Sequence, residues 1–131
     1  MSPEANALSK HRMERAQAAC KDGDLLAEQS SFRGAVNRYY YAAFHAARAL
    51  LATRDADSAR HAGVIALFQK HFVKTGDFSS DVARALPRSF EKRLSSDYSD
   101  FVEITEAEVV RIKSDVHSFV TACREYLARL E

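Results

Sequence analysis

The sequence predicts an all-α fold, an up-and-down antiparallel bundle of about five helices, four of which form the core. Two stretches, residues 36–51 and residues 109–130, carry apolar side chains at the three-and-four spacing of an amphipathic helix. In the second stretch the spacing is sustained and close to a heptad, as in helices packed in a bundle. Strand signals are missing throughout. The chain has 131 residues, enough for one core, so we expect a single domain over residues 1–131.

The first predicted helix runs from about residue 3 to about residue 29. Ser2 is a suitable cap, and Pro3 fits the first helical position. The pattern is alanine-rich and weakly amphipathic, and Gly23 within it costs about 1 kcal/mol relative to alanine. We expect one helix that continues through Gly23, is broken at residues 30–31, and leaves either serine to cap the next helix.

The central predicted helix, about residues 32–53, carries two neighbouring stripes. The core-facing stripe is apolar and consists of Val36, Tyr40, Ala43, Phe44, Ala47, Leu50 and Leu51. Beside it lies the basic row, which we define as Arg38, Tyr41, His45 and Arg48. Seven residues of α-helix span about 10 Å, so Arg38 and His45 share one face. Such a helix can build a core and hold an anion.

A polar connector over residues 54–59 leads to a third predicted helix, about residues 60–74, which ends at Gly76. Its histidines, His61 and His71, are ten residues apart and lie on opposite sides of the helix. We therefore expect surface or core roles for them and no ligand pair.

A fourth helix begins at residues 79–81, and Pro87 within it should kink it or delay its start, because proline lacks a backbone donor. After a connector over residues 99–104, Thr105 and Glu108 form a capping box for the last helix, which runs to about residue 130.

The composition excludes several classes of protein. Hydrophobic residues make up 47% and charged residues 28%, as in soluble globular domains. No apolar run approaches the roughly 20 residues that span a bilayer, and no signal-peptide pattern opens the chain, so we expect a cytoplasmic location without membrane contact. Cys20 and Cys123 match no metal-ligand spacing and fall on apolar faces, so we expect core cysteines, no metal and no other cofactor.

The formal net charge of +1 hides an asymmetry along the chain. Residues 33–95 hold 11 Lys and Arg against 5 Asp and Glu, whereas residues 96–131 hold 4 against 8. A basic middle can face a partner that bears phosphate, although the same charges can pair the helices with one another.

Three stretches occur in an order and spacing found together in one family. They are Ala35–Leu51 with its Arg38-Tyr-Tyr-Tyr41-Ala-Ala-Phe-His45 core, His61-Ala-Gly63 through Gly76, and Arg93-x-x-x-Asp97-Tyr98. Together they resemble the HEPN superfamily of helical-bundle proteins, over about residues 10–130. The resemblance implies a homodimer with a cleft between its subunits, which in many members binds nucleotide or cuts RNA without a metal. It also implies a minimal nucleotidyltransferase partner, as in toxin–antitoxin pairs.

The nuclease motif of this superfamily is an arginine, usually followed by a polar residue, with a histidine five to seven positions on. Arg38 and His45 have this spacing, although Tyr39 follows the arginine. Arg93 is the second candidate by position, with Tyr98 where a histidine would stand. Both copies thus depart from the family's pattern.

Two functions are therefore open. In the first, Arg38 and His45 are catalytic: His45 acts as acid or base on a ribose 2′-hydroxyl, and Arg38 holds the phosphate. The accompanying nucleotide- or RNA-binding residues are then Tyr41, Arg48, Arg93, Asp97 and Tyr98. Tyr41 would donate a hydrogen bond or stack on a base.

In the second, the chain is a structural interaction module in which the same residues hold the bundle and the dimer together. Arg38 pairs with Asp97, Tyr41 and Tyr98 complete a buried network, and His45 has a satisfied hydrogen bond beside the core. An ion pair between Arg93 and Asp97, at i and i+4, is a further option.

Overall fold

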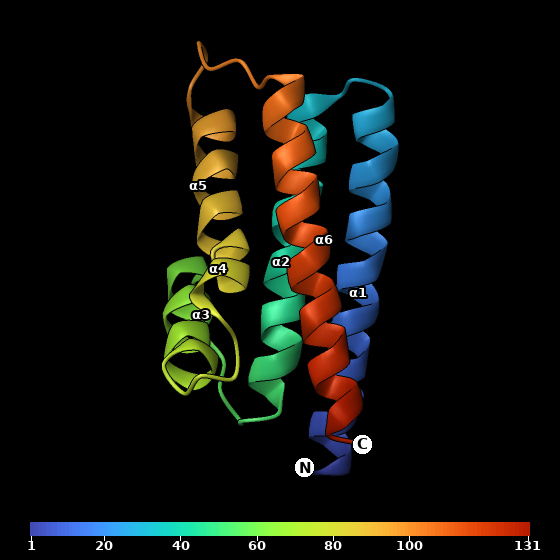
Figure 1. The fold of residues 1–131 in the computed structure, drawn as a ribbon, viewed down its shortest axis with the longest axis vertical. Helices are drawn as coiled ribbons and strands as arrows, with labels where there is room; N and C mark the ends of the chain where they lie inside the picture. The colour runs from blue at the N-terminus through green and yellow to red at the C-terminus, as the bar shows by residue number, and fades with distance from the viewer.

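The computed structural model describes residues 1–131 and is all-helical, as predicted. Its four long helices run alternately up and down: α1 (Pro3–Glu28), α2 (Phe32–Ala52), α5 (Ala85–Tyr98) and α6 (Glu106–Arg129). In Figure 1, α1 and α5 stand on either side of α6, α2 lies behind α6, and both termini lie at one end of the bundle. No helix is both long enough and apolar enough to cross a membrane.

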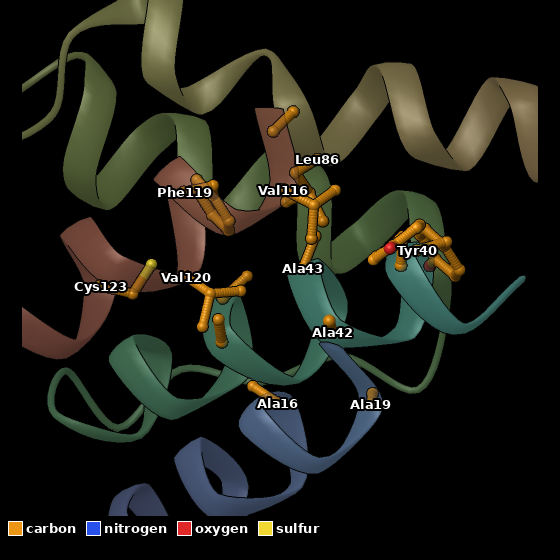
Figure 2. Close-up of a cluster of buried hydrophobic side chains, with 14 of the residues drawn as sticks. Ala16, Ala19, Tyr40, Ala42, Ala43, Leu86, Val116, Phe119, Val120 and Cys123 are labelled. Carbon is orange, nitrogen blue, oxygen red and sulfur yellow. The ribbon is translucent and has the colours of Figure 1, made fainter. Parts of the chain in front are cut away.

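Helix α2 is the centre of the bundle, because it packs against α1, α3, α5 and α6. Thirteen of its 21 residues are buried, so only a narrow strip of the helix reaches solvent. Figure 2 shows Val116 of α6 beside Ala43 of α2, and Val116, Phe119, Val120 and Cys123 of α6 are all buried. The predicted burial of both cysteines is confirmed.

Helices α1 and α2 approach closely because small side chains line their contact. Ala16 and Ala19 of α1 lie beside Ala42 of α2 in Figure 2, and all three are buried. Gly23 continues this series, because a Cβ atom there would lie 2.8 Å from the Tyr39 ring. The helix runs unbroken through Gly23, as predicted, and the glycine provides the space for a fully buried tyrosine.

The junction between α1 and α2 differs from the prediction in one detail. Ser2 caps α1 through a bond of 3.0 Å from the Ala5 N–H, and Ser30 turns the chain with φ of 59°. Ser31 precedes α2 without a side-chain capping bond. Ser31 occupies the N-cap position, where its carbonyl accepts from the Ala35 N–H at 2.9 Å, but the side chain of neither serine bonds to the first turn of α2.

The third predicted helix is two segments, α3 (His61–Phe68) and a π-helical turn η1 (Gln69–Val73). Its stacked rings, Phe68 and Phe72, are both buried with centroids 5.1 Å apart. Residues four apart share a face in either helix type, so hydrophobic spacing alone does not distinguish the two. The chain then turns at Gly76, where φ is +84°.

Pro87 has the predicted effect on the fourth helix. A short helix α4 (Ser80–Ala83), capped by Ser79, stops at Arg84, and α5 begins at Ala85. Proline cannot donate to the carbonyl four residues earlier, which belongs to Ala83, so the break falls where the bond would have been.

The capping box of α6 is confirmed, with Thr105 Oγ1 accepting from the Glu108 N–H at 3.2 Å. In the apolar stripe of α6, Val109, Val116, Phe119 and Cys123 are buried and Ile112 is half-buried. Leu130, which directly follows the helix, is 49% exposed. Phe44 is only half-buried, because it lies at the edge of α2 and packs on His61 of α3.

We expect Gly23→Ala to destabilise the protein by about 1–3 kcal/mol, because the new methyl group would overpack against the Tyr39 ring. In an exposed helix the same change would stabilise by about 1 kcal/mol. Urea unfolding at neutral pH measures the difference. Gly34→Ala is the control, because its Cβ would meet the movable end of Leu26 at 3.2 Å and the Ser31 Oγ atom at an ordinary contact distance of 3.5 Å. Equal effects of the two changes would contradict the role assigned to Gly23.

Candidate functional site

The basic row occupies the strip of α2 that the other helices leave open. Arg38, Tyr41 and Arg48 are half-buried, whereas His45 is buried with 8% of its surface exposed. Arginines of α1 flank the row on one side, and His61 of α3 with Arg93 of α5 flank it on the other. The row is therefore an open face at the junction of four helices.

His45 lies among positive charges. Burial, followed by the charges of Arg15, Arg48, Arg38 and Arg12, lowers its pKa to about 4, so the imidazole is neutral at pH 7. Its Nδ1 atom is buried and has no hydrogen-bond partner. An unpaired buried polar atom costs free energy, so the fold itself makes no use of this nitrogen. The prediction of a satisfied hydrogen bond at His45 is wrong.

Arg38 does not pair with Asp97. Its Nε and one amino group donate to the Asn37 side-chain oxygen at 3.1 and 2.7 Å, and its guanidinium lies 5.2 Å from the Tyr41 ring centroid. Asp97 contacts Arg93 instead, at 3.1 Å from its Nε, as the i and i+4 spacing on α5 allows. The buried network predicted around Arg38 and Asp97 is therefore absent, because a partner one turn away is nearer than one on another helix.

Tyr41 and Tyr98 also have different surroundings from those in that network. Two guanidiniums lie over the Tyr41 ring, Arg38 at 5.2 Å and Arg93 at 5.4 Å from its centroid. Its ring centroid is also 6.0 Å from those of both His45 and His61. Tyr98 is 77% exposed and belongs to no buried cluster. Because two guanidiniums lie over the ring of Tyr41, its hydroxyl is better placed to hydrogen-bond a ligand than its ring faces are to stack on one.

A second carboxylate, which the sequence analysis did not single out, neutralises part of the arginine cluster. Asp57 accepts from Arg48 at 3.1 and 2.8 Å, from Arg12 at 3.1 Å and from the Ser58 N–H at 2.8 Å. The bonds from Arg48 are the main reason that the pKa of Asp57 falls to about 2. Arg12 is nearly buried, and its other amino group donates to the Arg48 carbonyl at 3.0 Å. The one indication of this ion pair in the sequence was Arg12, a charged residue on the face of α1 that also carries the buried Ser9 and Ala16.

A second histidine also reaches this face, although its expected role was surface or core. His61 opens α3, and its Nδ1 is hydrogen-bonded to the buried Tyr40 hydroxyl. Its ring stacks on Phe44, with centroids 4.7 Å apart. Consecutive residues Tyr40 and Tyr41 thus connect the core and the open face.

The structure brings together Arg38, Tyr41, His45, Arg48 and Arg93, with Asp97 held by Arg93, and leaves Tyr98 at the periphery. None of these residues lines the hollow between α1 and α6, which measures about 280 Å³ near the chain termini. Most residues that line the hollow are polar, but none of them is a histidine, whereas the charged face of α2 holds the buried His45 among arginines. The face of α2 is therefore the better candidate for chemistry.

The comparisons with known proteins agree with the resemblance seen in the sequence. The HEPN domain family matches residues 9–126. A UPF0332 protein from Thermotoga maritima is 33% identical over 117 residues, which cover 89% of each chain. A protein of Methanocaldococcus jannaschii named "Putative toxin" is 35% identical over 106 residues, 81% of this chain and 78% of its own. A second protein of that name and organism is 27% identical over 88% of this chain and 78% of its own.

We expect Asp57→Asn to lower stability at pH 7 by about 1–3 kcal/mol, because it weakens the acceptor of a nearly buried arginine. The folded-state pKa of Asp57 lies below its ordinary value, so its contribution is complete above about pH 4 and is lost as the pH falls towards 2. Urea unfolding of the wild type and of Asp57→Asn between pH 7 and about pH 2 should show that the difference between their free energies of unfolding shrinks as the pH falls. A difference that stays constant with pH would contradict the ion-pair account.

Proposed function

Because the chain belongs to the HEPN family, we propose that it binds RNA or nucleotide phosphates on the open face of α2. It acts, in this proposal, as the toxin-type member of a pair whose other member is a minimal nucleotidyltransferase. Two relatives bear the name "Putative toxin", which supports the toxin part of the proposal. The nucleotidyltransferase rests on the resemblance to HEPN proteins encoded beside such enzymes.

The observation that carries the proposal is the environment of His45. A buried ring nitrogen without a partner lies among four arginines, of which Arg12 and Arg48 share the single carboxylate of Asp57. Arg15 makes no ion pair, and Arg38 bonds only to the neutral Asn37. A folded chain gains nothing from clustering unpaired cations, whereas a phosphate would turn their repulsion into charge-assisted hydrogen bonds.

The same face suits metal-independent cleavage of RNA. His45 would accept the proton of a ribose 2′-hydroxyl, whose oxygen attacks the adjacent phosphorus to form a 2′,3′-cyclic phosphate. The bond from phosphorus to the 5′-oxygen breaks, and that oxygen takes a proton from water. Arg38 and Arg48 would stabilise the charge that develops on the phosphate. A bound phosphate would also offset the arginine charges that lower the pKa of His45, and so make it a better base. Catalytic roles for Arg38 and His45 are part of the proposal.

One observation favours the structural alternative for part of the cluster. Asp57 joins α1 to α2 through Arg12 and Arg48, and such a bridge holds helices in register whether or not a ligand binds. Under this alternative the chain is a non-catalytic interaction module. The alternative does not account for Arg15, Arg38 or the unpaired nitrogen of His45, so we prefer the phosphate-binding function.

We expect His45→Ala to leave folding intact and to abolish RNA cleavage, or to weaken RNA binding where the wild type only binds. Arg38→Ala should reduce affinity and lower the salt slope of binding by about one unit, because one phosphate contact is lost. Filter binding of a labelled single-stranded RNA across a salt series measures both. Arg88→Ala is the matched control, because Arg88 is exposed on α5 and makes no ion pair.

Wild-type protein that binds neither RNA nor nucleotide at low salt would reject the function. A loss of stability in Arg38→Ala of several kcal/mol, without any change in RNA affinity, would favour the structural alternative instead. Cleavage that requires the 2′-hydroxyl would show that His45 acts on ribose, since a DNA of the same sequence lacks the nucleophile.

A homodimer with a cleft between the subunits is also part of the proposal. Half-buried Tyr41 and Phe44 give the open strip of α2 an aromatic character suited to an interface. Sedimentation should show a dimer at micromolar concentration. A monomer throughout would remove the shared cleft and leave each α2 face to bind alone.

A further inference from the structure

His61 is held in one orientation by the core and by the rings around it. Its Nδ1 is hydrogen-bonded to the hydroxyl of Tyr40, a residue with no exposed surface. Its ring is stacked between Phe44, at 4.7 Å and 25°, and Phe90, at 5.9 Å and 11°. Helices α2, α3 and α5 therefore all contribute to fixing this imidazole.

The hydrogen bond to Tyr40 decides which ring nitrogen carries the proton. Burial is the main cause that raises the pKa of Tyr40, so its hydroxyl keeps its proton at neutral pH. Nδ1 of His61 is the one hydrogen-bond partner of this buried hydroxyl, so the hydroxyl proton is satisfied only when it is donated to Nδ1. Burial and then the charge of Arg93 lower the pKa of His61, so the ring is neutral at pH 7. A neutral imidazole that accepts at Nδ1 carries its proton on Nε2. Because Nδ1 faces the buried hydroxyl, Nε2 lies on the side of the ring away from it.

Arg93 provides charge next to this donor. Its guanidinium lies 5.5 Å from the centroid of Tyr40 and 5.4 Å from that of Tyr41. Its Nε lies 3.1 Å from Asp97 without forming a hydrogen bond, and its terminal amino groups contact no carboxylate and donate to no group within the protein. Three donor groups, two on Arg93 and one on His61, are thus free beside Tyr41.

We propose that His61 contacts the ligand, and that its Nε2–H and the amino groups of Arg93 form a phosphate subsite on the α3–α5 side of Tyr41. Arg38 and His45 form the other subsite, towards α1, so that Tyr41 stands between two phosphates of one strand. Tyr40 is a positioning residue, which acts only by fixing the proton on Nε2. That the ligand is a nucleic-acid strand rests on the function proposed above, whereas the subsite itself requires only that a ligand carry a phosphate group.

The first experiment tests the donor without RNA. Long-range ¹H–¹⁵N spectra of the full chain should show the His61 proton on Nε2, and titration with inorganic phosphate should shift that resonance. Tyr40→Phe should keep the fold and allow both tautomers of His61 to appear. A proton on Nδ1 in the wild type, or no response of His61 to phosphate, would overturn the proposal.

The second experiment measures affinity for a labelled single-stranded RNA. His61→Phe keeps a ring between Phe44 and Phe90 but removes the donor, and should weaken binding about tenfold or more, as for a lost bond to a charged group. His61→Gln should restore part of the loss through its amide N–H. His71→Phe is the matched control, because His71 is half-buried on η1 and contacts Phe72 outside the cluster.

The outcomes separate the two proposals. RNA binding that His61→Phe leaves unchanged, with melting temperature also unchanged, would reject the subsite and leave the proposed function standing. Should His61→Phe unfold the chain, the phosphate titration of wild type and Tyr40→Phe decides the question. Absence of RNA binding together with a phosphate response at His61 would reject the function and support the subsite.

Discussion

The close contact between α1 and α2 is the constraint on which the rest of the structure depends. Alanines and Gly23 allow the two helices to approach until backbone and short side chains meet. Polar groups trapped at such a contact need partners within it. Ser9 donates to the Ala49 carbonyl at 2.8 Å, and Arg12 to the Arg48 carbonyl at 3.0 Å. At the far end Asp24 accepts from Tyr39 at 2.5 Å and from His117 of α6 at 2.9 Å.

This contact also creates the electrostatics of the site. Because α1 lies so close, Arg12 and Arg15 lie within range of His45, and with Arg38 and Arg48 they depress the pKa of that histidine. Only one carboxylate, Asp57, faces this group, and it satisfies the two arginines that bridge the helices. The face thus has a neutralised half, which stabilises the bundle, and an uncompensated half, which suits an anion.

Two adjacent tyrosines connect this face to the remaining helices. Tyr40 points into the core and fixes His61, whereas Tyr41 lies on the open strip beneath the guanidiniums of Arg38 and Arg93. Successive helical residues differ by about 100° around the axis, so one dipeptide serves both packing and chemistry. The arrangement explains how one face of a helical bundle can orient several polar groups.

The sequence alone determined the helices and their faces, because apolar periodicity and capping residues act locally. It located α1 through Gly23, the capping box at Thr105 and the break before Pro87, and it placed Arg38, Tyr41, His45 and Arg48 in one row. It did not reveal that η1 is π-helical, because residues four apart keep the same face in both forms.

Only the tertiary structure decided which polar side chains meet. Asp57 lies in a connector, and its partner Arg12 is 45 residues away in the chain. His61 begins a short helix, and its partner Tyr40 is 21 residues away. Local spacing favoured the pair of Arg93 with Asp97, one turn apart, but gave no means to choose between Asp97 and Asn37 as the partner of Arg38. Charge pairing depends on distances across helices, and for the bridge of Arg12 and Arg48 through Asp57 those distances follow from the close contact of α1 and α2.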